Sequence, residues 1–153
     1  MNGNSGVAFI DISSTGTSVG TPTDDAQFAV TLPFSFNYNG TNYTAGRVSN
    51  NGWLAMGTTN SGTSGGYSNV CLPTAASSFN ATNGDVICAN WDDMIPSGTV
   101  TTSIKTQQVG SVFIIQWTNE DNFNATGTGV ITFQMQLEQT TNNIHFVYPD
   151  ITY

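Results

Sequence analysis

Apolar and polar residues alternate along most of the chain with a period of two residues. Between Ala26 and Tyr38, apolar side chains occupy every second position. The alternation returns over residues 113–117, 131–137 and 144–148. A period of two places successive side chains on opposite faces of a β-strand, and no segment shows the period of a helix. The pattern therefore predicts an all-β fold.

Turn signals separate these strands at short intervals. Asn39-Gly40 and Asn51-Gly52 are typical of tight β-hairpins, and residues 140–143 turn the chain between the last two strands. This spacing favours a single-domain antiparallel β-sandwich of about nine or ten short strands. We expect the domain to span residues 1–153, with a loop-rich insertion at about residues 58–85 that begins with a run of Gly, Ser, Thr and Asn.

The composition is typical of an exported β-protein. Of 153 residues, 38% are hydrophobic and 11% aromatic, which is enough for one core, but only 8% are charged. The net charge is -8, and Arg47 and Lys105 cannot form a basic patch for a phosphate backbone, which excludes a nucleic-acid partner. No apolar run approaches the roughly 20 residues of a transmembrane helix. We expect an extracellular or cell-surface location without membrane insertion.

The chain contains two cysteines, Cys71 and Cys88. In an exported protein this pair favours one disulfide that closes a modest loop, and two unrelated buried thiols are the alternative. A metal site at these thiols is disfavoured, because His145 is the only histidine and no Cys-x-x-Cys spacing occurs.

No residues show the spacing of a catalytic site. His145 lies mid-strand on the face opposite the aromatic side chains, where a surface position is favoured over the role of a catalytic base. Glu138 follows Gln134 and Gln136 on the polar face of its strand, and we expect this face to be solvated. The Glu120-Asp121 pair follows a strand and is expected in a turn. We therefore predict no enzyme activity and no catalytic residues.

Two further acidic pairs lie in loops. Asp24-Asp25 precedes the strand that begins near Ala26, and Asp92-Asp93 follows Trp91. Adjacent carboxylates repel one another unless they are solvated or neutralised by a cation. Loops rich in oxygen atoms at the end of a sandwich suit calcium, which takes six to eight oxygen ligands. The sequence therefore gives Asp24, Asp25, Asp92 and Asp93 as candidate calcium ligands, and turn aspartates that cap backbone amides are the alternative.

Sequons of the form Asn-x-Ser/Thr mark candidate glycosylation sites. They begin at Asn39, Asn42, Asn80 and Asn124, all in predicted turns or loops. Such triplets also arise by chance in a chain rich in Asn and Thr, so they indicate surface positions first.

One aromatic residue is a candidate for ligand binding. A glycan-binding site needs exposed aromatic side chains beside Asn, Asp or Gln. Trp53 and Trp91 lie near loops, but packing in the core explains them equally well. Tyr67 lies in a Gly-rich loop without apolar neighbours in sequence, and is therefore the stronger candidate.

Short motifs spread over nearly the whole chain carry a resemblance to a known family. They are Phe-Ile-Asp-Ile-Ser at 9–13, Leu-Pro-Phe-Ser-Phe-Asn-Tyr-Asn-Gly at 32–40, Val-Ser-Asn-Asn-Gly-Trp-Leu at 48–54, the block 87–93 that ends in Trp-Asp-Asp, and the strands at 113–119 and 132–148. In these motifs the chain resembles the nidogen-like β-modules of secreted and surface bacterial proteins. The resemblance implies an extracellular module for adhesion or assembly, and it implies no catalytic set. The chain departs from the family in its loop at 58–69, its cysteine pair and its scarcity of Lys and Arg.

We therefore expect a non-catalytic extracellular adhesion or interaction module of a bacterial surface or secreted protein. One alternative is a structural subunit of an extracellular filament assembled by strand exchange, because open sheet edges accept a strand from a neighbour. A carbohydrate-binding module is the second alternative. The expected partners are other extracellular proteins, glycans or copies of the chain itself.

Overall fold

The structure, a computed structural model, describes residues 7–57, 66–69, 85–125, 127 and 129–149. These residues form ten β-strands and one turn of 3-10 helix, η2. The elements are β1 (Thr17–Ser18), β2 (Gln27–Tyr38), β3 (Thr41–Ser49), β4 (Trp53–Met56), β5 (Val86–Cys88), β6 (Met94–Pro96), β7 (Ser103–Val109), β8 (Val112–Asn122), η2 (Phe123–Ala125), β9 (Val130–Glu138) and β10 (Ile144–Val147).

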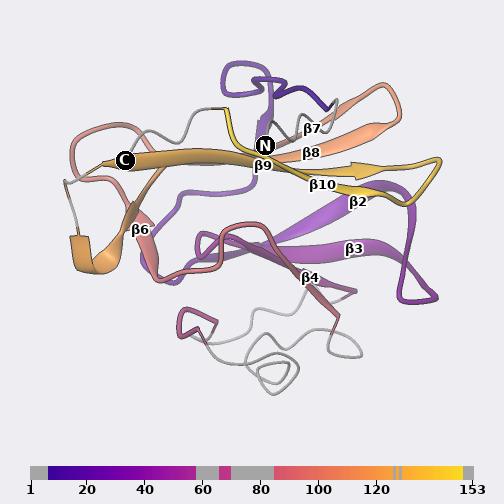
Figure 1. The fold of residues 1–153 in the computed structure, drawn as a ribbon, viewed down its shortest axis with the longest axis horizontal. Helices are drawn as coiled ribbons and strands as arrows, with labels where there is room; N and C mark the ends of the chain where they lie inside the picture. Colours follow the sequence, from indigo (N-terminus) through magenta and orange to yellow (C-terminus); the bar gives the residue numbers. More distant parts are fainter. Residues whose placement is uncertain (1–6, 58–65, 70–84, 126, 128, 150–153) are drawn as a thin grey trace, which may run out of the picture.

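Two antiparallel sheets pack face to face, as Figure 1 shows. One sheet has the order β1-β7-β8-β9-β10, with β6 paired to the end of β8, and the other has the order β2-β3-β4-β5. Every strand pairing is antiparallel. The sandwich predicted from the sequence is therefore confirmed.

The alternating pattern of the sequence forms the core between the two sheets. In β2, the buried positions Val30, Leu32 and Phe36 alternate with exposed ones, as a half-buried strand requires. From the other sheet, Trp117 stacks on Phe133 with ring centroids 4.9 Å apart. Apolar side chains of both sheets belong to one continuous cluster, so the core lies where the sequence placed it.

The predicted hairpins are present. Asn39 and Gly40 connect β2 to β3 with φ of 49° and 80°, as a tight turn that matches the twist of the strands requires. Asn51-Gly52 lies in the connection between β3 and β4. Among the described residues, no helix has the length and apolar character needed to cross a membrane.

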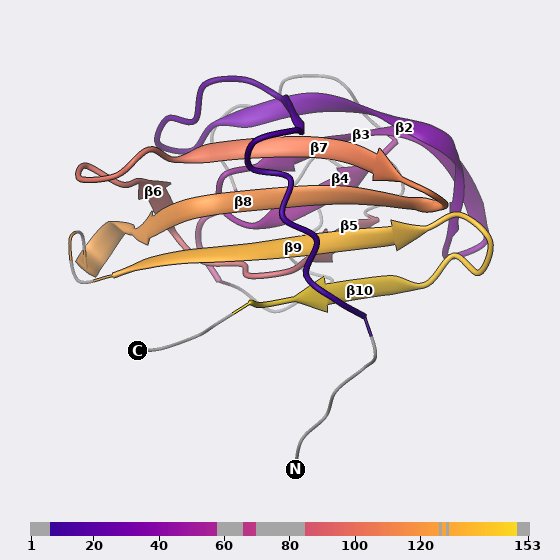
Figure 2. The same ribbon diagram turned by 90° about the horizontal axis from the view of Figure 1, so that it is seen from above.

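The outer face of β8 and β9 differs from the prediction. Gln134 and Gln136 were expected in solvent, but their side chains are 0% and 1% exposed. Residues 7–13, which we call the strap, cross this face of the sheet, as Figure 2 shows. The alternation located the polar face correctly, but the covering segment comes from a distant part of the sequence.

Glu120 and Asp121 also differ from the prediction, because both are buried inside β8 and not in a turn. The register between β8 and β9 shifts after Trp117, where Asn119 has a φ of 58°. This β-bulge inserts an extra residue and reverses the alternation of the strand's faces. Glu120 therefore pairs with Ile131, which packs against the core, and its side chain lies on the inner side of the sheet.

Candidate functional site

Three carboxylates meet at the end of the sandwich where β2 begins and β8 ends. Asp24 and Asp25 lie in the loop before β2, and Asp93 lies in the loop before β6. One carboxylate oxygen from each residue lies within 4.8 Å of the other two. We call Asp24, Asp25 and Asp93 the acidic cluster. The sequence predicted that these loops would come together.

The fourth predicted ligand, Asp92, takes another role. Its Oδ1 accepts a hydrogen bond from the backbone N–H of Asp93 at 2.9 Å, and its Oδ2 accepts one from Asn122 Nδ2 at 3.0 Å. Asp92 therefore fastens the loop to the end of β8, and it is outside the set of three converging carboxylates. Of the four candidate ligands, the structure brings three together.

A buried asparagine holds the two loops of the acidic cluster in place. Asn51 Nδ2 donates to Asp25 Oδ1 at 2.8 Å, and Asn51 Oδ1 accepts from the backbone N–H of Met94 at 2.8 Å. Asn51 is fully buried, so its bond to Met94 is shielded from water and its bond to Asp25 is partly shielded. Sequence reasoning assigned Asn51 only to a turn and missed this positioning role. The Asn-Gly turn signal gives no information about such distant partners.

The carboxylates of the acidic cluster affect one another electrostatically. Partial burial is the main cause that raises the pKa of Asp93, and the charges of Asp25, Asp24 and Asp92 raise it further. A bound cation would lower this pKa by neutralising the repulsion. Carboxylate oxygens are the ligands that calcium prefers, so the residue types of the cluster fit this ion.

Two exposed aromatic side chains border the acidic cluster. A cavity of about 330 Å³ is lined by Asp24, Asp25 and Asp93 together with Tyr67 and Phe123. Tyr67 and Phe123 are 40% and 47% exposed, so part of each ring faces solvent at the rim of this cavity. The structure therefore places the predicted ligand-binding residue Tyr67 beside three of the predicted calcium ligands.

Two tryptophans fix the segment that carries Tyr67. The carbonyl oxygen of Gly66 accepts hydrogen bonds from Trp53 Nε1 at 3.0 Å and from Trp91 Nε1 at 2.5 Å. Gly66 has a φ of 82°, and a Cβ atom there would lie 2.9 Å from Trp53 Nε1, so only glycine fits. Asn69 Nδ2 also donates to the backbone oxygen of Trp91 at 2.7 Å. Trp53 and Trp91 thus hold in place the short segment that carries Tyr67.

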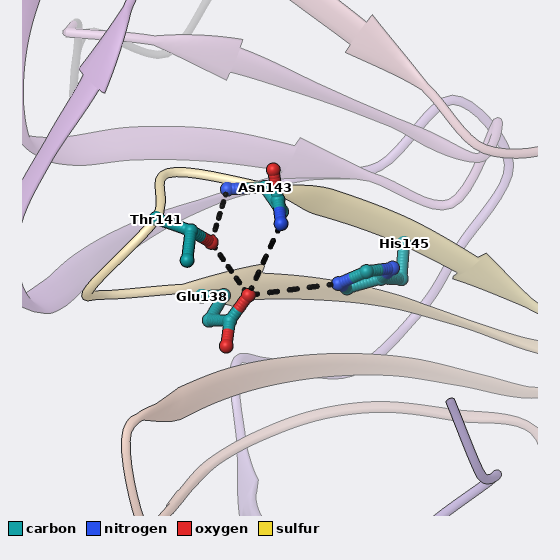
Figure 3. Close-up of polar contacts among 4 residues, drawn as sticks. All are labelled: Glu138, Thr141, Asn143 and His145. Atoms are coloured by element: carbon teal, nitrogen blue, oxygen red, sulfur yellow. Dashed lines mark hydrogen bonds and ion pairs between the residues drawn. The ribbon is translucent and has the colours of Figure 1, made fainter. Parts of the chain in front are cut away.

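Glu138 and His145 lie near the hairpin between β9 and β10, as Figure 3 shows. Glu138 Oε2 accepts hydrogen bonds from Thr141 Oγ1 at 2.5 Å and Asn143 Nδ2 at 3.3 Å, and it lies 3.9 Å from His145 Nε2. The bond from Thr141 is the main cause that lowers the pKa of Glu138. The Thr141 hydroxyl donates to the Glu138 carboxylate and not to the His145 imidazole. These residues therefore lack the hydrogen bond between a nucleophile and a base that covalent catalysis requires.

Glu120 is a buried carboxyl group that does not belong to the acidic cluster. Its side chain is 0% exposed, and neither of its oxygens has a hydrogen-bond partner among the described residues. Burial raises the pKa of Glu120 to about 8, so the group is largely protonated at neutral pH.

The comparison with known families agrees with the fold. A family model described as NIDO related matches residues 1–152. The chain belongs to this nidogen-related family. Membership confirms the resemblance drawn from the sequence motifs and points to an extracellular interaction module. No curated protein and no solved structure matches the chain significantly.

The cysteine pair of this nidogen-related chain is only partly described. Cys88, on β5, is a free and partly buried thiol in the structure, and burial raises its pKa to about 11. The predicted disulfide is therefore not seen in the structure. Cys71 lies outside the described residues, and its pairing with Cys88 stays a prediction.

The asparagines of three of the four sequons of the nidogen-related chain lie in the described residues. Asn39 is exposed at a hairpin tip, and Asn124 is exposed in η2. Asn42 is exposed too, but it lies on β3 and not in a turn, because β3 starts directly after the Asn39-Gly40 turn. Asn80 lies outside the described residues.

Proposed function

We propose that this nidogen-related chain is a non-catalytic extracellular adhesion module of a surface or secreted protein. In this proposal it binds its partner at the acidic cluster, and calcium is part of the binding surface. The observation that carries the proposal is the convergence of three carboxylates beside two exposed aromatic side chains in one open cavity. Ligand sites typically combine apolar contact area with a few convergent polar groups.

Calcium would be held by Asp24, Asp25 and Asp93. The ion supplies positive charge, and it accepts further oxygen ligands from water or from a partner. The chain's own residues do the positioning, because Asn51 links the two loops through Asp25 and Met94. A partner that offers carboxylate or hydroxyl oxygens would complete the coordination.

The absence of enzyme activity is part of the proposal. The single histidine of the chain, His145, lies 3.9 Å from Glu138, and the nearby Thr141 hydroxyl donates to Glu138 and not to the imidazole.

A nucleic-acid partner is equally unsuitable, because Arg47 is buried with its guanidinium 5.8 Å from the Trp53 ring centre, and Lys105 donates to a backbone oxygen. Both basic groups are therefore used inside the fold.

A carbohydrate partner is the second candidate for the same site. Tyr67 and Phe123 offer exposed ring surface beside the acidic cluster, and sugar hydroxyls are both hydrogen-bond donors and calcium ligands. A glycan array probed with and without calcium separates a glycan from a protein partner. Binding that requires calcium and is lost in Tyr67→Ala supports the glycan, and the absence of any glycan signal contradicts it.

The proposal is tested by calorimetric titration of calcium into the chain and two matched variants. Asp93→Asn removes a carboxylate of the acidic cluster, whereas Asp92→Asn removes the same charge at the adjacent position. We expect binding by the unmodified chain, a loss of at least about tenfold in affinity for Asp93→Asn, and a much smaller loss for Asp92→Asn. No binding by the unmodified chain, or equal losses in the two variants, would contradict the calcium site.

A further inference from the structure

The strap, residues 7–13, crosses the outer face of the larger sheet without joining it. Figure 2 shows it passing over β9, β8 and β7. The strap belongs to neither strand ladder, since β1 starts only at Thr17. Its removal would therefore leave every strand pairing intact.

Three glutamines hold the strap by its main chain. Gln136 Nε2 donates to the backbone oxygen of Ala8 at 3.0 Å. Gln134 Nε2 donates to the backbone oxygen of Ile10 at 2.6 Å, and its Oε1 accepts from the N–H of Ile10 at 3.3 Å.

The third glutamine continues the series. Gln116 Oε1 accepts from the N–H of Ile12 at 2.9 Å. The bonded positions of the strap are thus every second residue, which is the repeat of an extended chain. We call Gln116, Gln134 and Gln136 the glutamine row.

The three glutamines of the row are bonded to one another as well as to the strap. Gln136 Nε2 donates to Gln134 Oε1 at 2.8 Å, and Gln134 Nε2 donates to Gln116 Oε1 at 2.7 Å. With the strap in place, all three residues are at most 1% exposed. Each amide therefore has a set orientation, with donors and acceptors directed at an extended main chain, and Lys105 Nζ extends the series by donating to the backbone oxygen of Ser13 at 2.5 Å.

Two side chains of the strap add to this contact, because Asp11 Oδ1 accepts a hydrogen bond from Gln116 Nε2 at 3.0 Å and Ile12 is fully buried. Ala8 and Ile10 are exposed, so at these two positions the main chain makes the bonds to the row. Recognition that rests on main-chain hydrogen bonds tolerates different sequences, as in the addition of a strand to a sheet edge. Here side-chain amides take the place of the sheet edge.

We propose that the glutamine row is a binding site for an extended peptide main chain, and that in assemblies residues 7–13 of a second copy of this chain occupy it. The strap is the segment whose fit to the row is directly seen, and a strap from another copy would make the same contacts. Reciprocal exchange gives a closed dimer, and exchange in one direction gives a filament. This inference is independent of the calcium site.

The chain's own strap competes with a strap from a second copy. A tethered segment has an effective concentration in the millimolar range, so exchange is expected only when the internal contact is weakened or the protein is concentrated. Ile10→Pro weakens it, because it removes the N–H that Gln134 accepts, and Ile10 is 37% exposed, so little packing is lost.

The test mixes two complementary variants. The strap variant, Ile10→Pro, keeps an intact glutamine row, and the row variant, Gln134→Met with Gln136→Met, keeps an intact strap and similar side-chain volumes. Each variant alone is expected to have the mass of one chain, 16.2 kDa, by light scattering after size exclusion. We expect the equimolar mixture to form a species of twice this mass. Gln108→Met, at an exposed glutamine of β7 outside the row, replaces the row variant in the control mixture, which should gain no such species.

A peptide measurement keeps the proposal testable if the row variant does not fold. A fluorescent peptide with the sequence of residues 7–13 is titrated into the strap variant, and the same peptide with a methylated amide nitrogen at residue 10 is the control. We expect saturable binding of the first peptide and at least about tenfold weaker binding of the second, since methylation removes the donor. A mixture of folded variants that stays at the mass of one chain, or equal binding of the two peptides, would overturn the proposal.

Discussion

Glu120 makes the stability of the fold depend on pH in a direction that can be predicted. Its carboxyl group is buried without a hydrogen-bond partner among the described residues, and its pKa rises from 4.5 to about 8. The folded chain keeps this proton over a pH range in which the unfolded chain has already lost it. The free energy of unfolding therefore falls as the pH rises from about 4.5 to about 8, and the contribution of Glu120 is constant above that range.

The size of the effect follows from the shift. One pKa unit corresponds to about 1.4 kcal/mol, so stability falls by up to about 1.4 kcal/mol for each pH unit. Over the whole interval between 4.5 and about 8 the loss is at most roughly 5 kcal/mol. This loss is a large part of the total free energy of unfolding of a typical domain, which is about 5 to 15 kcal/mol.

Glu120→Gln tests this reasoning, because the amide keeps the size of the side chain and does not titrate. We expect the variant to match the unmodified chain near pH 5 and to be more stable by about 3 kcal/mol or more at pH 8. Urea unfolding followed by the fluorescence of the buried Trp53 and Trp117 measures the difference at each pH. Asp93 also has a raised pKa, but its contribution is the same in both chains and cancels.

Glu138→Gln is the matched control, since Glu138 is partly exposed and the pKa of its carboxyl group is lowered. This variant should leave the slope between pH 5 and pH 8 unchanged. If Glu120→Gln and the unmodified chain show the same dependence on pH over this interval, the carboxyl group of Glu120 is not held protonated and the argument fails.

Three further predictions concern the candidate site and the cysteines. Asn51→Leu leaves the buried N–H of Met94 without its acceptor, so we expect a loss of about 1 to 3 kcal/mol in urea unfolding and weaker calcium binding by calorimetry. Gly66→Ala places a Cβ at a φ of 82°, and we expect a cost of about 1 to 3 kcal/mol in thermal unfolding. If Cys71 and Cys88 are paired, no thiol is alkylated in the native protein and reduction costs about 2 to 4 kcal/mol; two reactive thiols would refute the pairing.

The sequence predicts those parts of the fold that depend on local pattern. The alternation in β2 and the Asn39-Gly40 turn depend on neighbouring residues, and both are present in the structure. The convergence of Asp25 and Asp93 was also within reach, because loops at one end of a sandwich come together. The sequence could not predict the burial of Glu120, because a single bulged residue reverses the faces of β8.

The strap shows a second limit of pattern reasoning. Gln134 and Gln136 alternate with apolar residues, and this pattern normally indicates a solvated face. Their partners Ile10 and Ala8 lie 124 and 128 positions away, and the strap has no periodic signal of its own. The one hint in sequence is the chemical type, since amides that both donate and accept are suited to a main chain.

The location of the calcium site is the central claim, and amide chemical shifts from a nuclear magnetic resonance titration with calcium test it most directly. The account predicts saturable shifts at Asp24, Asp25 and Asp93, with smaller changes at the adjoining Tyr67, and little change around Glu138 at the opposite end of β9. In Asp93→Asn the shifts at Asp24 and Asp25 should require far more calcium. A spectrum unchanged by millimolar calcium, or shifts centred away from the acidic cluster, would contradict the account.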